Sequence, residues 1–371
     1  MKKICILTTS HLADDTRIFH KEAKSLAQTG WQVVFIVRHR QAEEMQGIRI
    51  IPLSMETGRF SRFFILPWKA FCAAFMEKAD VYHFHDPELL FSMVVLKIIT
   101  RAKVIYDVHE NVPADILTRR WIPSLIRPVV SRIFNFFEKT AARYFDFIIV
   151  VNETIKKSFS SVSIKNVKVI SNFPIVDFSK KRKTDPIIKN TLRVIYVGSL
   201  SREYGIKEMV DAMEILNHNV ELVIVGCFED LFFEREIKSR NVKNVKFMGR
   251  VPYHRIAELL EDSDIGIICF PPLSNYINSG FGSNKLFEYM GAGLPVIATD
   301  FPNLRAIVEG NKCGICVDST NPHEMAEAIS YLLSHKDIAD RMGENGKKAV
   351  DTIYNWNLES KKLLRIYHKL L

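Results

Sequence analysis

The sequence predicts two α/β units, each built on a doubly wound, parallel sheet of the Rossmann type. Short β-branched runs alternate with longer amphipathic stretches, which is the pattern of repeated strand–helix–strand units. A chain of 371 residues is long enough for about two domains with separate cores. The segment from 177 to 190 is polar and lysine-rich, and its lack of an apolar period indicates a linker between the two units.

These observations define the expected domains and strands. We expect a first domain over 1–175, a linker over 176–191, a second domain over 192–355 and a final helix over 356–371. The strands expected in the first domain are Ile4–Thr8, Gln32–Val37, Ile48–Pro52, Val81–His83, Lys103–Asp107, Phe147–Val151 and Val167–Ile170. Those of the second are Arg193–Val197, Glu221–Val225, Val245–Met248, Ile265–Cys269 and Pro295–Thr299. We expect a ligand cleft between the domains, at the carboxyl ends of the strands.

Composition and the length of the apolar runs argue against a secreted or membrane-spanning protein. An apolar content of 47% and a charged content of 25% are those of an ordinary globular protein. The apolar run Ile4–Leu7 is too short for a signal peptide, and the longest apolar stretch, Phe63–Met76, is interrupted by Pro67 and Lys69. We therefore expect no transmembrane helix. Six cysteines without a secretion signal favour reduced thiols and a cytoplasmic location.

Cys313 and Cys316 have the spacing of a redox or metal-binding pair. No second pair or nearby histidine completes a zinc site, and the GICV run that contains Cys316 is typical of a strand. We expect both thiols to serve packing, and we expect no metal.

The net charge of +9 is unevenly distributed. Residues 1–190 contain 30 Lys and Arg against 18 Asp and Glu, whereas residues 191–371 contain 21 against 24. A basic first half indicates an anionic partner for that half. No nucleic-acid-binding motif is present, so an anionic membrane surface is the preferred candidate and nucleic acid is not expected.

The stretch from 128 to 145 predicts a helix with two different faces. Its expected core face consists of Val130, Ile133, Phe134, Phe137 and Ala141. Arg132, Lys139 and Arg143 fall on the opposite side at 100° per residue. Two interpretations stay open, a solvated basic face and an interfacial surface that docks on anionic lipid.

The stretch NYINSGFGSNKLFEYMGAGLPVIATD, from Asn275 to Asp300, predicts a loop, a short helix, a tight turn and a buried strand. Gly280 and Gly282 allow the loop to bend, and Ser283 is a good N-cap for the helix that starts at Lys285. A glycine-rich loop that enters a helix presents free N–H groups and suits a phosphate. Lys285 adds a charge there, and Glu288 lies about one turn deeper. The alternative is an ordinary helix N-terminus.

Polar residues also follow the strands of the first domain. They are His11, Asp15 and Arg17 after the first strand, His85 and Asp86 after a later one, and His109 and Glu110 after the next. A histidine in such a position can donate a proton to a developing oxyanion or leaving group. For the first group, a capped helix start with a solvated Arg17 remains the alternative.

The string SNKLFEYMGAGLPVIATD resembles the donor-site signature of the retaining, GT-B-fold glycosyltransferases of family 4. In that family a Glu-x7-Glu element spans the loop and helix, and its second Glu corresponds to Glu288. Gly280 stands where the first Glu would be, as in a branch that reads NYxxSxPxKLFEYM. The loop after the first strand is similar to a branch that reads HxxxDTRIF.

The resemblance implies roles for particular residues. His109 would face the donor sugar and diphosphate, and Glu288 would hold the ribose hydroxyls. Ser199 and Tyr204 stand where the family usually has an Arg and a Lys that bind the diphosphate, so we expect Arg202 to replace them. The other donor-binding residues implied are Gly198, Gly226, Gly249, Val251, Gly282, Ser283, Asn284, Lys285 and Leu286. The final helix would cross back to the first domain.

The expected activity is that of a retaining, metal-independent glycosyltransferase without a cofactor. It would move a sugar from a UDP- or GDP-sugar to a saccharide or lipid-linked acceptor in cell-surface polysaccharide or glycolipid assembly, on the inner face of the membrane. The catalytic residues would be His109, Lys285 and Glu288. Those on the acceptor side would be His11, Asp15, Arg17, His85, Asp86 and Glu110. Two alternatives stay open, a GT-B-fold epimerase of nucleotide sugars and an inactive scaffold that binds them. Base, sugar, acceptor, linkage and oligomeric state are left open.

Overall fold

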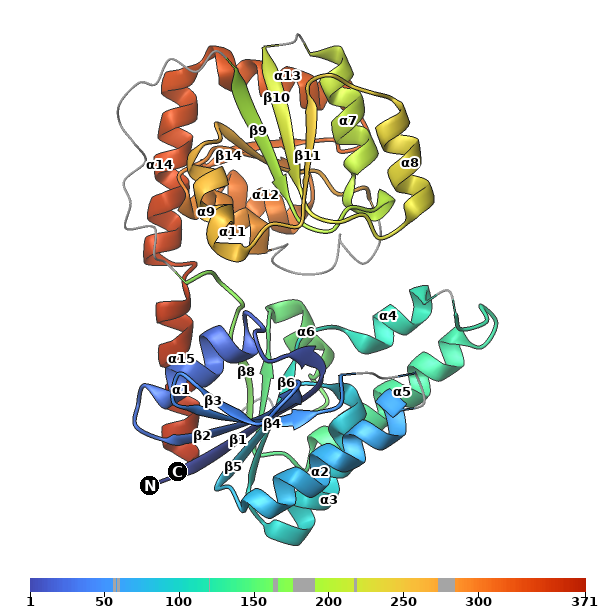
Figure 1. Ribbon diagram of the computed structural model, residues 1–371, viewed down its shortest axis with the longest axis vertical. Coiled ribbons are helices and arrows are strands. Elements are labelled where there is room, and N and C mark those ends of the chain that lie inside the picture. The colour runs from blue at the N-terminus through green and yellow to red at the C-terminus, as the bar shows by residue number, and fades with distance from the viewer. Residues whose placement is uncertain are drawn as a thin grey trace. The chain divides into compact units, whose positions relative to one another are not determined.

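The computed structural model describes residues 1–55, 58, 61–119, 121–162, 166–175, 191–216, 219–272 and 284–371. The chain forms two compact units (Figure 1). The first contains Met1–Asn172 together with Trp356–Leu371, and the second contains Phe173–Asn355. Almost all of the expected linker lies outside the described residues, as do Gly280, Gly282 and Ser283.

The first unit is built on an eight-stranded sheet in the order β3-β4-β2-β1-β5-β6-β7-β8. All neighbouring strands are parallel except β3 and β4. The strands are β1 (Lys3–Leu12), β2 (Gln32–Arg38), β3 (Glu43–Met45), β4 (Ile48–Leu53), β5 (Val81–Phe84), β6 (Lys103–Val108), β7 (Phe147–Val150) and β8 (Val167–Val169). The short edge strand β3 was not expected, because its residues Glu43, Glu44 and Met45 have no β-rich pattern.

Helices cover both faces of this sheet (Figure 1). One face packs against α2 (Leu66–Glu77), α3 (Leu90–Thr100), α5 (Arg127–Ala142) and α6 (Glu153–Ser158). The other packs against the π-helix η1 (Ile18–Ala23), α1 (Lys24–Ala27) and the last helix, α15 (Trp356–Leu370). Further helical segments are η2 (Ser61–Ile65), η3 (Pro87–Leu89) and α4 (Val112–Thr118). In β1, Cys5 and Leu7 face one core while Ile4 and Ile6 face the other, as a strand buried on both sides requires.

The second unit has a six-stranded, all-parallel sheet in the order β11-β10-β9-β12-β13-β14. Its strands are β9 (Leu192–Val197), β10 (Val220–Val225), β11 (Val245–Gly249), β12 (Ile265–Ile268), β13 (Val296–Thr299) and β14 (Gly314–Val317). Its helices are η5 (Arg202–Tyr204), α7 (Ile206–Ile215), α8 (Leu231–Ser239), α9 (Tyr253–Glu261), α11 (Asn284–Gly291), α12 (Pro302–Val308), α13 (Pro322–Ser334) and α14 (Lys336–Thr352). Each sheet face carries an apolar core. The doubly wound α/β fold expected from the sequence is confirmed.

The predicted faces of α5 are partly wrong. Lys139 is buried instead of solvated, with its Nζ 3.1 Å from the centroid of the Phe159 ring and 3.4 Å from Glu138 Oε2. Ile133 and Phe137, expected in the core, are 64% and 40% exposed. Glu138 of the same helix is also buried, and it accepts a hydrogen bond from the buried Tyr106 hydroxyl at 3.0 Å. A hydrophobicity pattern cannot anticipate a buried polar pair of this kind.

Two other expectations concern membranes and thiols. Among the described residues, no helix is both long enough and apolar enough to cross a membrane.

Cys313 is buried and Cys316 is half-buried in β14, and burial raises the pKa of each thiol to about 12. Such thiols are poor nucleophiles near neutral pH, in line with a packing role.

Candidate functional site

In the first unit, polar side chains gather where β1, β5 and β6 end. Asp86 follows β5, and its Oδ2 accepts hydrogen bonds from the Thr8 hydroxyl at 2.7 Å and the Thr9 N–H at 2.5 Å. This carboxylate therefore holds the end of β1 in place. The His11 Nε2 lies 4.0 Å from Asp86 Oδ1, so the same carboxylate also faces the imidazole.

His11 and Asp15 form a pair at the start of η1. Nδ1 of His11 lies 3.0 Å from Oδ2 of Asp15, whose Oδ1 accepts the N–H groups of Arg17 and Ile18 at 2.9 and 2.8 Å. Burial alone would raise the pKa of Asp15, but His11 and the Ile18 N–H lower it to about 2. Burial lowers the pKa of His11, and the Asp15 contact and nearby carboxylates outweigh this and raise it. His11 thus stays protonated to a higher pH than a free histidine.

His109 lies in front of buried partners. Its Nε2 is 3.1 Å from Nδ1 of His85 and 3.6 Å from Oδ1 of Asp107. The His109 side chain is 19% exposed, whereas those of His85 and Asp107 are fully buried. The ring centroids of His11 and His109 are 5.7 Å apart. Of the histidines brought together here, His11 and His109 are the two that a ligand can reach.

Arg17 is buried rather than solvated. Its Nη2 donates to both oxygens of Asp107 at 3.1 and 2.9 Å, and its Nη1 donates to the carbonyl of Ile170 at 3.1 Å. The guanidinium therefore links the start of η1 to β6 and to the end of β8. Glu110 is exposed, and burial together with the Glu110 charge raises the pKa of Asp115 to about 6.

Sequence reasoning did not select three buried members of this region, Glu22, His83 and Asp107. His83 and Asp107 interrupt apolar strand runs, VYHF and VIYDV, which is a signal that could have found them. Glu22 carries no such signal, because a lone Glu in a helical stretch is ordinarily solvated.

In the second unit, the ammonium group of Lys285 lies among three aromatic rings. Its Nζ is 5.0, 4.8 and 5.8 Å from the ring centroids of Tyr196, Tyr204 and Phe270, which we call the aromatic cluster. It donates to the Tyr196 hydroxyl at 3.3 Å. Burial lowers the pKa of Lys285 to about 8, partly offset by the charges of Glu288 and Glu229. Lys285 is therefore a partly desolvated cation in the first turn of α11.

Two glycines make room for this lysine. Gly198 follows β9 with φ of 151°, and a Cβ there would lie 2.1 Å from Cε of Lys285. Gly226 follows β10 with φ of 150°, and a Cβ there would lie 1.8 Å from the Gly198 carbonyl oxygen. Any side chain at either position would displace its neighbour, so the Lys285 position depends on both glycines.

The remaining predicted donor residues differ in what they contact. Arg202 forms an ion pair with Glu236 and lies 4.7 Å from the Phe233 ring, so its guanidinium is directed at α8. Glu288 is half-buried in α11, and Leu286 is fully buried and anchors that helix. Asn284 is exposed, Val251 is half-buried, and Gly249 ends β11.

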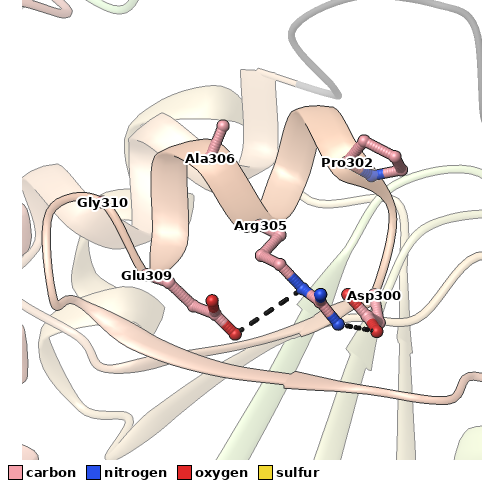
Figure 2. A pocket seen from close by; sticks show the side chains of 6 residues that line it. All are labelled: Asp300, Pro302, Arg305, Ala306, Glu309 and Gly310. Carbon is pink, nitrogen blue, oxygen red and sulfur yellow. Dashed lines mark hydrogen bonds and ion pairs between the residues drawn. The ribbon is translucent and has the colours of Figure 1, made fainter.

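Two cavities lie within single units. One, of about 500 Å³, is lined by Asp300, Pro302, Arg305, Ala306, Glu309 and Gly310 on and beside α12 (Figure 2). Arg305 is paired there with Asp300 and Glu309, and no predicted site residue lines the cavity. The other, of about 320 Å³, lies between α4 and α5 and is lined by Asn111, Pro113, Ala114, Leu117, Ser131, Arg132, Asn135 and Ser158. Asn111, the first lining residue in the chain, directly follows His109 and Glu110.

The fold is that of the GT-B glycosyltransferases. HepE from Anabaena, in a crystal structure with UDP-glucose, superimposes with a TM-score of 0.75 at 16% identity, covering 100% of both chains. Sucrose-phosphate synthase from Thermosynechococcus elongatus gives a TM-score of 0.74 at 18% identity, covering 100% of this chain and 99% of that one. The GT-B fold expected from the resemblance is confirmed.

Two family models match adjoining parts of the sequence, Glycosyltransferase Family 4 over residues 16–176 and Glycosyl transferases group 1 over 177–349. The chain belongs to family 4 of the glycosyltransferases. An uncharacterised glycosyltransferase of Methanocaldococcus jannaschii is 26% identical over 332 residues, 81% of this chain and 80% of the relative. Phosphatidyl-myo-inositol mannosyltransferase of Mycobacterium tuberculosis is 23% identical over 298 residues, 78% and 73%. The comparison of Gly280 with the first Glu of the Glu-x7-Glu element stays a prediction.

Proposed function

We propose that this glycosyltransferase takes a sugar from a UDP- or GDP-sugar and transfers it, with retention of configuration, to a saccharide or lipid-linked acceptor. The observation that carries the proposal is the position of Lys285. This partly desolvated cation lies against the aromatic cluster, in space that the absence of a side chain at Gly198 leaves open. The HepE structures that contain UDP and UDP-glucose support a nucleotide-sugar donor.

Lys285 would compensate the charge of the leaving diphosphate. In this transfer the sugar–oxygen bond breaks and negative charge grows on the diphosphate, so a preorganised cation stabilises the transition state. Because Lys285 supplies that charge itself, we propose that no metal ion is needed on the diphosphate. Glu288, one turn along α11, would accept hydrogen bonds from the ribose hydroxyls, and Arg202 would reach the diphosphate only after leaving Glu236.

His109 would act on the sugar and leaving group. If His85 donates its Nδ1–H across the 3.1 Å contact, Nε2 of His109 is the acceptor and its Nδ1 carries the proton. That N–H is then available as a donor to the substrate. The leaving phosphate would take the proton of the acceptor hydroxyl, so the reaction requires no separate nucleophile from the chain.

The test is incubation with a panel of UDP- and GDP-sugars, following nucleotide release with and without saccharide and lipid-linked acceptors. A transferase releases nucleotide in proportion to the glycosylated product, whose anomeric configuration NMR then compares with that of the donor. Sugar interconversion without an acceptor would identify an epimerase. Tight binding without turnover would identify an inactive scaffold. An inverted product would overturn the retaining mechanism.

We further propose that the first unit docks on an anionic membrane through α4 and α5, as a cytoplasmic enzyme on the inner face would. Exposed large apolar side chains around these helices are Leu117, Trp121, Leu125, Ile126, Val129, Ile133, Phe136 and Phe137. Arg132 on α5 and Arg143, the residue that follows the helix, are exposed as well. Apolar side chains beside cations suit a lipid surface, and the α4–α5 groove would place the headgroup of a lipid-linked acceptor near His109.

A further inference from the structure

Four buried side chains of the first unit converge behind His109, and the proposed function does not use them as a group. They are Glu22 from η1, His83 from β5, His85 just after β5, and Asp107 from β6. Each offers a nitrogen or oxygen atom, and these four atoms all lie within 4.8 Å of one another. We call this group the buried histidine–carboxylate site.

The inner atoms of this site lack hydrogen-bond partners among the residues that the structure describes. They are Nε2 of His83, Nε2 of His85 and Oε2 of Glu22. Nε2 of His85 lies 3.6 Å from Oε2 of Glu22, and Nε2 of His83 lies 3.6 Å from Oδ2 of Asp107. Both separations are too long for a hydrogen bond. They are close to the roughly 3.4 Å between two ligands of a tetrahedral ion with bonds of about 2.1 Å.

The outer atoms of the same side chains are already held. Nδ1 of His83 lies 2.8 Å from the Tyr367 hydroxyl of α15, and Nδ1 of His85 lies 3.1 Å from Nε2 of His109. Arg17 contacts both oxygens of Asp107 and lies 2.9 Å from Oε1 of Glu22. When Nδ1 of a histidine carries the hydrogen, its Nε2 lone pair is free for a metal ion, and such outer contacts are what orient metal ligands in proteins.

Arg17 accounts for only part of this network. It is ion-paired with both carboxylates, 2.9 Å from Oε1 of Glu22 and 2.9 Å from Oδ2 of Asp107. Each neutral imidazole could direct its own N–H at the facing carboxylate, but at 3.6 Å neither pair makes a hydrogen bond. A divalent ion at the centre would satisfy both pairs at once.

We propose that the buried histidine–carboxylate site binds one divalent transition-metal ion, with zinc as the best fit to two imidazoles and two carboxylates. The ion is structural, because its ligands are fully buried and leave no position open to substrate. It joins η1, β5 and β6, and through Tyr367 it helps to hold α15. It also fixes the tautomer of His85, which in turn sets the proton position on His109.

The first experiment uses the full chain without an affinity tag, purified without chelator. Unfolding in the presence of a chromogenic chelator releases buried ions, and plasma mass spectrometry identifies them. We expect about one zinc, or another divalent first-row ion, per chain. Less than about 0.1 ion per chain, both as isolated and after refolding with zinc, would overturn the proposal.

Variants then assign the ion to this site. Glu22→Gln and His83→Gln should each lose it, whereas the matched control His335→Gln, at an exposed position of the second unit, should keep it. If the variants fail to fold, X-ray absorption on the wild-type chain decides instead. Two imidazole nitrogens and two oxygens at about 2.0–2.2 Å support the site. Sulfur ligands, or a shell of oxygen ligands alone, would show that the ion binds elsewhere and would reject the proposed site.

Discussion

The two units share an architecture but differ in where their polar groups lie. Each has a parallel sheet covered by helices on both faces. The first unit buries a network of Arg, carboxylate and histidine side chains behind His109, whereas the candidate site of the second centres on Lys285 among aromatic rings. Most exposed large apolar side chains among the described residues also belong to the first unit. One fold thus supports two kinds of site, because function depends on the loops at the strand ends.

The surfaces differ in the same way as the sites. The first 190 residues have a surplus of 12 basic groups (30 minus 18), and the rest has a deficit of three (21 minus 24). In line with this difference, we propose that the second unit binds the donor and that the first binds the acceptor at a membrane.

Lys285→Gln should lower kcat/KM for the donor about 1000-fold, because it removes the cation that faces the developing charge. The matched control is Lys207→Gln, at an exposed lysine of α7 paired with Asp211. Steady-state kinetics of both variants make the comparison. An equal loss in the control, or near-normal activity in Lys285→Gln, would remove Lys285 from the donor site.

His109→Ala should lower kcat about 100-fold while donor affinity changes little, because its contact strengthens as the leaving group departs. Calorimetry with the nucleotide and single-turnover kinetics separate the two quantities. His323→Ala, at an exposed histidine of α13, is the control. Equal losses in binding and turnover would show that His109 binds the donor in the ground state. Such a result would count against the proposal that donor binding belongs to the second unit.

Glu288→Gln should weaken nucleotide binding by about 1–3 kcal/mol, the scale for losing a hydrogen bond to a charged group. The expected cause is the loss of ribose hydroxyl contacts one turn into α11. Glu344→Gln, at an exposed glutamate of α14, provides the control. Calorimetry should compare the variant with wild type, using a nucleotide and its 2′,3′-dideoxy analogue. If the variant binds the nucleotide as tightly as wild type does, and likewise the analogue, Glu288 does not hold the ribose.

Donor affinity should fall as the pH rises through 8. Burial lowers the pKa of Lys285 to about 8, so the free protein carries this charge below that pH and loses it above. Affinity should be level near neutral pH and should decrease about tenfold per unit well above pH 8. The Lys285→Gln variant should lack this dependence. A wild-type profile that stays flat up to pH 9.5 would contradict a binding role for the charge.

Membrane docking should depend on α5 of the first unit and not on exposed apolar groups of the second. Wild type should co-sediment with anionic vesicles at low salt and less at high salt, because each basic group contributes roughly 1 kcal/mol near such a surface. The variant Arg132→Glu, Ile133→Ser, Phe136→Ser should lose several-fold in binding. Leu231→Ser, Phe232→Ser, on the exposed face of α8, is the matched control. Equal losses, or no binding by wild type, would reject docking through α5.

The sequence alone predicted most of the strands, the fold with two parallel sheets and the family. Strand runs such as Ile4–Leu7 are buried on both faces, so their pattern is local and continuous. The SNKLFEYMGAGLPVIATD string identified α11 and Lys285 in the same way, and polar residues at strand ends identified His11, Asp86 and His109. Local patterns suffice when one element carries the whole signal.

Which groups face each other depends on the tertiary structure. In α5, Lys139 is buried and Ile133 is exposed, and Glu138 accepts a hydrogen bond from Tyr106 of β6. Glu22 joins His83 and Asp107, and Gly198 supports Lys285, across long separations in the chain. Such contacts depend on how helices dock on a sheet, and that docking is set by the packing of all partners together. The buried network behind His109 therefore has no counterpart in any single stretch of sequence.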